Sequence, residues 1–210
     1  MSSTPPHPPD VTLAILAGGA SRRLGGAPKG LLQIDGSSIL ERLLTLRPLV
    51  AQVLLATTDP APYADFGLTS VADPIRGKGA PGGLLAALEA ATTPWVLAVG
   101  CDMPFVTAPV VERLLRARGP EVDAVCFEVA HRLEPLLAVY RSALHSRFRE
   151  ALSGAPSLTG LLVSVRTCVL PEQALVEVDP QLRSVVGVNT SEEANAVGAS
   201  LPLAAMRRLP

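Results

Sequence analysis

Residues 11–30 read VTLAILAGGASRRLGGAPKG, and this stretch decides the fold. It opens with a mostly apolar run that stops at Gly18-Gly19, a pattern typical of a strand buried on both faces of a sheet. Similar short apolar runs recur at Gln52–Thr57 and Trp95–Gly100, with helical patterns between them. Strands that alternate with helices indicate a mostly parallel sheet covered on both faces. The sequence therefore predicts a single α/β domain with three layers, α/β/α.

The rest of the chain adds further elements to this pattern. We expect a turn at Asp35-Gly36 and a last helix that starts with a capping box at Thr190–Glu193. Further strands are expected at Leu68–Ala72, Asp123–Val129, Leu136–Tyr140, Thr167–Leu170, Leu175–Val178 and Ser184–Asn189. Further helices are expected from Ser37 or Ser38 to Pro48, over Gly82–Ala91, from the cap Thr107 to Ala117, over Ser142–Leu152, and from Ser157 onward.

Length and composition exclude several classes of protein. The 210 residues suit one domain, which we place at 11–199 between a proline-rich, disordered tail at 1–10 and a C-terminal tail at 200–210. The net charge of −1 argues against a nucleic-acid-binding surface. The N-terminus lacks the features of a signal peptide, and no apolar run approaches the length of a membrane span. Three scattered cysteines are typical of cytosolic thiols, so we expect a cytoplasmic protein without membrane or nucleic-acid partners.

Chemistry-bearing residues follow the expected strands. In a parallel α/β sheet, ligands bind at the carboxyl ends of the strands. The loops that leave those ends carry Gly18 to Lys29, then Asp73 to Gly83, then Asp102. Only two of the 18 basic residues are lysines, Lys29 and Lys78, and each lies in one of the two glycine-rich loops. Two such loops and a carboxylate at one edge predict a site for a phosphorylated ligand with a metal ion.

The first loop is the stronger of the two phosphate-site candidates. It is neither a Walker A motif nor a dinucleotide-binding GxGxxG motif. Its glycines let backbone N–H groups approach phosphate oxygens, and Arg22, Arg23 and Lys29 supply positive charge. The alternative is a structural strand-to-helix turn with solvated arginines. For Lys78 alone, coincidence is the favoured interpretation.

Asp102 is the candidate metal ligand. Mg²⁺ in proteins typically takes one or two carboxylates together with substrate phosphates and water. Asp102 could instead cap the following turn, and Asp73, which precedes Pro74, could either initiate a turn or contact the ligand. We interpret Cys101 as a small buried residue, because no histidine spacing or Cys–His pairing indicates a nucleophile.

The first loop resembles the signature of nucleotidyltransferases with a Rossmann-like fold, in which LAGG…S-x-R-[ML]-G…K opens the chain. Its Gly-Gly form is similar to that of the molybdenum cofactor guanylyltransferase (MobA) family. The resemblance covers about residues 11–197 and implies a sheet of the nucleotide-diphospho-sugar transferase type. It continues through Asp73 and Gly83-Leu-Leu-Ala-Ala, Cys101-Asp102-Met-Pro104, Glu134-Pro-Leu-Leu-Ala-Val-Tyr140 and Val188-Asn189-Thr190-Ser-Glu-Glu193.

The resemblance also implies roles for individual residues. Lys29 would contact the phosphates of GTP, with Arg23 as a further cation, and Asp102 would contact both nucleotide and Mg²⁺. Asn189 matches an asparagine near the reaction centre that assists the metal or the acceptor. Contacts with the guanine nucleotide would come from Leu16, Ala17 and Gly18, loop shape from Gly19, and a nucleoside contact from Asp73.

Three positions depart from the family pattern. Pro28 replaces the aspartate that usually precedes the lysine, although its fixed φ can preorganise the loop. Gly187 stands where some members carry a second asparagine, and the nucleotide-contacting asparagine after the second strand has no match near Ala56-Thr57-Thr58.

The implied reaction is transfer of GMP from GTP to the terminal phosphate of molybdopterin that carries molybdenum, with release of pyrophosphate. Its partners would be GTP, the molybdopterin-type acceptor and, transiently, enzymes that make or receive the cofactor. One alternative is a sister nucleotidyltransferase that uses CTP on the same cofactor or on a small phosphorylated acceptor. Another is a non-catalytic nucleotide-binding module, although the presence of both Lys29 and Asp102 disfavours it.

Overall fold

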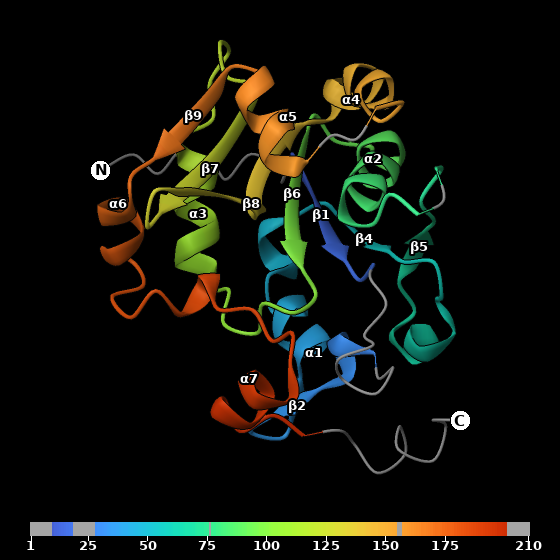
Figure 1. The fold of residues 1–210 in the computed structure, drawn as a ribbon, viewed down its shortest axis with the longest axis vertical. Coiled ribbons are helices and arrows are strands. Elements are labelled where there is room, and N and C mark those ends of the chain that lie inside the picture. Colours follow the sequence, from blue (N-terminus) through green and yellow to red (C-terminus); the bar gives the residue numbers. More distant parts are fainter. Residues whose placement is uncertain (1–9, 19–27, 76, 155–156, 201–210) are drawn as a thin grey trace.

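A computed structural model describes residues 10–18, 28–75, 77–154 and 157–200 (Figure 1). Its centre is a seven-stranded sheet in the order β5-β4-β1-β6-β8-β7-β9. Strand β8 is antiparallel to both of its neighbours, and every other adjacent pair is parallel. The expected α/β class and mostly parallel sheet are confirmed. The strands are β1 (Val11–Leu16), β4 (Gln52–Ala56), β5 (Thr69–Val71), β6 (Trp95–Gly100), β7 (Ala124–Val129), β8 (Arg132–Arg141) and β9 (Thr167–Leu170).

Helices cover both faces of the sheet and divide the apolar interior into two cores. The first core includes Leu13 and Ile15 of β1 and lies under α1 (Ile39–Leu44), α3 (Ala108–Arg116) and α6 (Glu172–Val176). The second core includes Ala14 and Leu16 and lies under α2 (Ala80–Ala90), α4 (His145–Ala151) and α5 (Leu158–Ser164). Because side chains alternate along a strand, β1 contributes to both cores and is buried throughout, which explains its continuous apolar run.

Local signals in the sequence fix several element ends. Ser38 caps α1 in a capping box with Glu41, and Thr190 caps α7 (Ser191–Ala196) in a capping box with Glu193. Thr107 is the N-cap of α3, but its side chain makes no capping hydrogen bond. The Asp35-Gly36 turn joins β2 (Gln33–Ile34) to β3 (Ser37–Ser38), and both turn residues have positive φ, +49° and +81°. Such a turn matches the twist of a hairpin.

Two expected strands are wrong. Leu175–Val178 is mostly apolar, but its first two residues belong to α6, which begins after the N-cap Pro171, and its last two form a turn. One helical turn is enough to bury Ala174 and Leu175 in the first core. Ser184–Asn189 instead begins within the 3₁₀ helix η6 (Arg183–Val185) and continues as a segment that is not a strand. That segment is held at the site rather than in the sheet, because the Val188 N–H donates to the Asp102 carbonyl at 2.8 Å.

The chain beyond α7 returns to the first third of the molecule. Ser200 pairs with Gln33 through two backbone hydrogen bonds, with N···O distances of 2.7 and 2.8 Å. Residues 1–9, most of the expected N-terminal tail, lie outside the described residues, as do residues 201–210 of the expected C-terminal tail. Within the described ranges, no helix has the length and apolar character that a membrane crossing requires.

Candidate active site

The carboxyl ends of β1 and β6 form the centre of the candidate site. Leu16 and Gly100 end these strands side by side, and the Cys101 N–H donates to the Leu16 carbonyl at 3.1 Å. The Ala17 N–H donates to the Ala56 carbonyl at 2.8 Å, so the first loop leaves the sheet between β4 and β6. Leu16, Ala17 and Gly18 thus lie at the edge where the sequence predicts nucleotide contacts. The predicted site residues Gly19 and Arg23 lie outside the described residues.

Lys29 is placed by a rigid turn. It begins the 3₁₀ helix η2 (Lys29–Leu31), and the Leu31 N–H donates to the Pro28 carbonyl at 3.0 Å. Pro28 has φ −63°, the value its ring enforces, so the proline fits the N-terminus of this turn. Gly30 is buried against Tyr63: a Cβ at Gly30 would lie 3.0 Å from Tyr63 Cε1. The backbone of Lys29 is therefore held from both sides.

The Lys29 ammonium joins two segments that are remote in sequence. Its Nζ lies 3.3 Å from Asp102 Oδ2 and 2.6 Å from Asn189 Oδ1. The Lys29 and Asp102 side chains are only 20% and 19% exposed, so their attraction is less screened than that of a surface pair. Three residues that the sequence assigns to one site therefore meet around a single cation.

Asp102 itself sits in a space that glycines leave open. A Cβ at Gly100 would lie 2.5 Å from Asp102 Oδ1, closer than real side chains approach. A Cβ at Gly187 would lie 3.0 Å from Asn189 Nδ2 and 3.8 Å from the Asp102 carboxyl carbon. Gly100 and Gly187 therefore allow the carboxylate and the amide to approach Lys29 together.

The chemistry of this donor set fits a magnesium ion. Asp102 Oδ2 and Asn189 Oδ1 both lie within 3.3 Å of one positive charge, and Mg²⁺ prefers oxygen ligands. Within the described ranges, no three His, Cys, Asp or Glu side chains gather as a complete metal site. Phosphate oxygens and water would have to complete the coordination, as they commonly do for Mg²⁺.

Asp73 lies at the other end of the site. Its Oδ1 accepts a hydrogen bond from the Ile75 N–H at 2.8 Å, so Asp73 does initiate a turn. Its carboxylate also packs on the first turn of α2, where a Cβ at Gly82 would lie 2.1 Å from Oδ1. Asp73 follows β5, three strand spacings from β6, which corresponds to about 14 Å across the sheet. Asp73 and Asp102 therefore follow strands that are well separated in the sheet.

Two further candidates have structural roles in the described residues. Cys101 is buried, and burial, together with the charge of Asp102, raises the pKa of its thiol to about 12. A thiol that stays protonated is not a nucleophile, which agrees with the expectation of a small buried residue. The Lys78 ammonium donates to the Gly154 carbonyl at 2.7 Å and thereby links the second glycine-rich loop to the end of α4.

Sequence reasoning missed residues that shape the site by packing against its loops. Tyr63, Gly82 and Gly100 were not singled out for packing against Gly30, Asp73 and Asp102 respectively, although these contacts fix the loops. The only signal for the two glycines was their position next to the candidate site. Nothing in the local sequence distinguishes Tyr63, because its contact with Gly30 joins segments that only the fold brings together.

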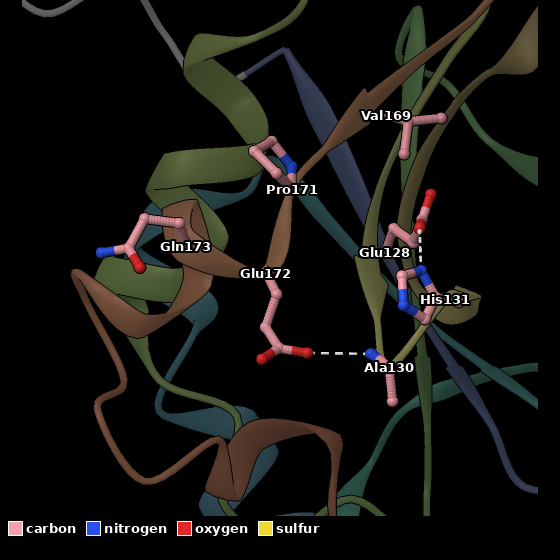
Figure 2. A pocket seen from close by; sticks show the side chains of 7 residues that line it. All are labelled: Glu128, Ala130, His131, Val169, Pro171, Glu172 and Gln173. Atoms are coloured by element: carbon pink, nitrogen blue, oxygen red, sulfur yellow. Dashed lines mark hydrogen bonds and ion pairs between the residues drawn. The ribbon is translucent and has the colours of Figure 1, made fainter.

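A separate cavity of about 470 Å³ lies beside the β7–β8 turn (Figure 2). None of the predicted site residues lines it. Glu172 accepts a hydrogen bond from the Ala130 N–H at 2.8 Å, and Ala130 and His131 have positive φ, +48° and +60°. These contacts hold a tight turn, from which the chain returns into the sheet as β8, between β6 and β7.

A sheet of this topology, with a glycine-lined edge that carries a lysine, a carboxylate and an amide, defines a nucleotide-binding enzyme of the α/β class. Comparison with known proteins makes the class specific. The chain belongs to the family described as the MobA-like NTP transferase domain, whose model matches residues 13–169.

Named relatives of similar length support this membership. The chain is 29% identical to the molybdenum cofactor guanylyltransferase of Desulfosudis oleivorans, over 91% of this chain and 96% of the relative. It is 32% identical to a probable molybdenum cofactor guanylyltransferase of Chloroflexus aggregans, over 89% and 93%. A solved structure, molybdopterin-guanine dinucleotide biosynthesis protein A from Archaeoglobus fulgidus, is similar with a TM-score of 0.75 and 25% identity, over 89% of this chain and 96% of that chain.

Proposed function

We propose that this protein transfers GMP from GTP to the terminal phosphate of molybdopterin that carries molybdenum. An acceptor phosphate oxygen bonds to the α-phosphorus of GTP, the bond between the α-phosphorus and the bridging oxygen breaks, and pyrophosphate leaves. The observation that carries the proposal is the Lys29 ammonium between Asp102 and Asn189, at the edge where the glycine-rich first loop leaves β1. The names of the relatives supply the guanine nucleotide and the acceptor.

The nucleotide lies along the carboxyl edge in this proposal. Leu16, Ala17 and Gly18, at the carboxyl end of β1, contact the nucleotide through their backbone. Asp73 contacts the nucleoside, about 14 Å across the sheet from the strand that leads to Asp102. An extended ligand between these two carboxylates places its phosphates next to Lys29.

Lys29 and Asp102 act on charge. Asp102 and Asn189 would hold a magnesium ion, which would neutralise phosphate charge and help to align the α-phosphorus. Lys29, on its flexible stem, then turns its ammonium from these oxygens to the phosphates, with Arg23 as a second cation. Without the ion, the Asp102 carboxylate and the triphosphate would repel each other. Before the nucleotide binds, the Lys29 ammonium balances the charge of Asp102.

No protein nucleophile is required. The acceptor phosphate is already an anion, and Cys101, the nearest thiol to Asp102 in sequence, is held protonated. Rate enhancement therefore comes from alignment of the two phosphates and from electrostatic stabilisation of the transition state.

The test is release of pyrophosphate from GTP, CTP, ATP and UTP, each with and without molybdopterin and Mg²⁺. We expect release with GTP only when both molybdopterin and Mg²⁺ are present. Faster release with CTP would make the protein a sister cytidylyltransferase. Binding of nucleotide in a thermal-shift assay without turnover of any nucleotide would make it a non-catalytic binding module.

A further inference from the structure

Glu134 stands at the same edge of the sheet as the candidate active site. Because β8 is antiparallel to β6, its first residues lie where β6 ends. Val99 is paired with Leu137, and across the register shift Leu133 is paired with Glu128 of β7, so Glu134 lies near the level at which β6 ends. Glu134 therefore stands on the strand next to β6, about 4.8 Å away, near the residues that lead to Asp102.

The backbone around Glu134 is free to present its side chain. The β7–β8 ladder shifts register between Cys126 and Glu128, and residues 134–136 are paired with neither neighbouring strand. Pro135, which has no N–H, therefore costs no ladder hydrogen bond. The β7–β8 turn that precedes this part of β8 is held by Glu172, as Figure 2 shows.

The segment around Glu134 contacts the second core, on whose side of the sheet Asp102 lies. Leu133, which precedes Glu134, packs against the second core, and Leu136 packs against both cores. Burial raises the pKa of Cys126, a thiol in the second core, to about 12, and the charge of Glu134 makes a smaller contribution. On β6, Gly100 is paired with Leu16 of the second core, and the space that a Gly100 side chain would occupy holds Asp102 Oδ1.

Glu134 differs from the other acidic residues of its hairpin and its neighbours. Glu128 lies 3.6 Å from His131 Nδ1, and Glu172 accepts the Ala130 N–H. Glu134 makes no hydrogen bond or ion pair with any residue that the structure describes. Burial raises the pKa of its carboxyl, with Arg132 opposing. A half-buried carboxylate without donors favours a ligand that brings N–H groups to it.

We propose that Glu134 binds the acceptor by accepting hydrogen bonds from the N–H donors of its ring system. The proposal rests on the proposed function, because it takes the acceptor to be molybdopterin. A pterin ring presents an amino group beside a ring N–H, and the two oxygens of one carboxylate accept both donors. Glu134 lies on the β8 side of Asp102, and Asp73 lies on the opposite side, after β5. The acceptor and the nucleotide therefore approach the phosphates from opposite ends of the edge.

The experiment compares Glu134→Gln with the control Glu128→Gln, which removes a charge from the same hairpin at a paired position. For each protein, pyrophosphate release gives KM for molybdopterin and kcat, calorimetry gives Kd for GTP with Mg²⁺, and a melt gives Tm. We expect Glu134→Gln to raise KM for molybdopterin about tenfold or more, since the amide presents an N–H where an acceptor is needed. Its kcat, its Kd for GTP and its Tm remain those of the wild type, and Glu128→Gln changes none of the four.

Other outcomes overturn the proposal in distinguishable ways. If wild type transfers GMP and Glu134→Gln keeps its KM for molybdopterin within about twofold, Glu134 does not bind the acceptor. Weaker binding of GTP with Mg²⁺ in Glu134→Gln would assign the carboxylate to the nucleotide instead. If Glu134→Gln fails to fold, Glu134→Asp replaces it, and an unchanged KM in that variant overturns the proposal. If wild type itself transfers no GMP, the proposed function fails, and this assignment fails with it.

Discussion

The two lysines of this chain lie in similar loops and have different partners. Lys29 and Lys78 each follow a glycine-rich stretch after a strand of the sheet. The Lys29 ammonium meets a carboxylate and an amide oxygen that come from segments 73 and 160 residues away. The Lys78 ammonium meets one backbone carbonyl, that of Gly154.

The difference shows that a partner's chemistry, rather than a loop's composition, separates a site lysine from a structural one. A backbone carbonyl carries no net charge, so the hydrogen bond of Lys78 only links two loops. Asp102 carries a charge that a metal ion can also satisfy, so Lys29 can be released when the ion and the phosphates arrive. Substitutions at these partners and at the lysines themselves test the contrast.

The largest effect is expected for Asp102→Asn. Loss of the carboxylate removes the charged metal ligand, so Mg²⁺-dependent turnover should fall by about 10³ or more while the fold is kept. Affinity for GTP without Mg²⁺ should hold or rise, because one negative charge is gone. Calorimetry of GTP with and without Mg²⁺ measures both effects. If Mg²⁺ improves binding and turnover equally in wild type and variant, Asp102 is not the metal ligand.

Lys29→Ala should lower kcat by about 10²–10³, because the developing charge on the transferred phosphoryl group loses its cation. Lys29→Arg should restore only part of the rate, since a planar guanidinium does not replace a compact ammonium. Steady-state kinetics with GTP and molybdopterin measures this, with Tm as the control for folding. If the alanine variant turns over at a rate near that of wild type, the first loop has only a structural role.

Asn189→Ala should raise the Mg²⁺ concentration needed for half-maximal turnover by about tenfold to a hundredfold. The effect should be smaller than that of Asp102→Asn, because the amide is neutral. A titration of turnover with Mg²⁺ measures the shift. Gly187→Ala is a companion variant, since its Cβ would lie 3.0 Å from Asn189 Nδ2 and displace the amide without removing it. An unchanged Mg²⁺ titration in Asn189→Ala would mean that Asn189 serves only to position Lys29.

The smallest effect is expected for Lys78→Ala. It removes one hydrogen bond to a carbonyl, so the free energy of unfolding should fall by about 1 kcal/mol or less and kcat/KM should stay within about twofold. Urea denaturation and steady-state kinetics measure the two quantities. A loss of turnover comparable to that of Lys29→Ala would remove the distinction between the two loops.

The sequence predicted the parts of the fold that depend on local pattern. Strands β1 and β6 are buried on both faces and are therefore continuous apolar runs. The expected cap at Ser37 or Ser38 and the expected capping box at Thr190–Glu193 marked the starts of α1 and α7 correctly. The errors fall at Leu175–Val178 and Ser184–Asn189, short apolar segments whose burial is satisfied by a single helical turn or by a contact with the Asp102 loop. Periodicity over so few residues does not separate a strand from these forms.

The sequence pointed to the residues of the candidate site but not to the contacts between them. Lys29, Asp102 and Asn189 were each identified from motifs, but only tertiary structure brings the three together. The same holds for Glu134: its motif was visible, whereas its position beside Asp102 depends on the antiparallel direction of β8. β8 is also longer than the expected strand at Leu136–Tyr140, because the sequence could not show that Pro135 lies where no ladder bond is needed.

Strand β8 connects two parts of the sheet, because β7 and β9 are joined to β6 only through it. Opening of the β6–β8 ladder would divide the sheet into two cooperative unfolding units. One unit keeps β1, β4, β5 and β6 with their loops, and the other keeps the β7–β8 hairpin with β9. Asp102 and Glu134 would then separate. The proposed acceptor site would be lost, while the strands around the proposed nucleotide site would remain paired. In native-state hydrogen exchange, the amides of β7, β8 and β9 should therefore share an opening free energy below that of β1, the strand at the centre of the other unit.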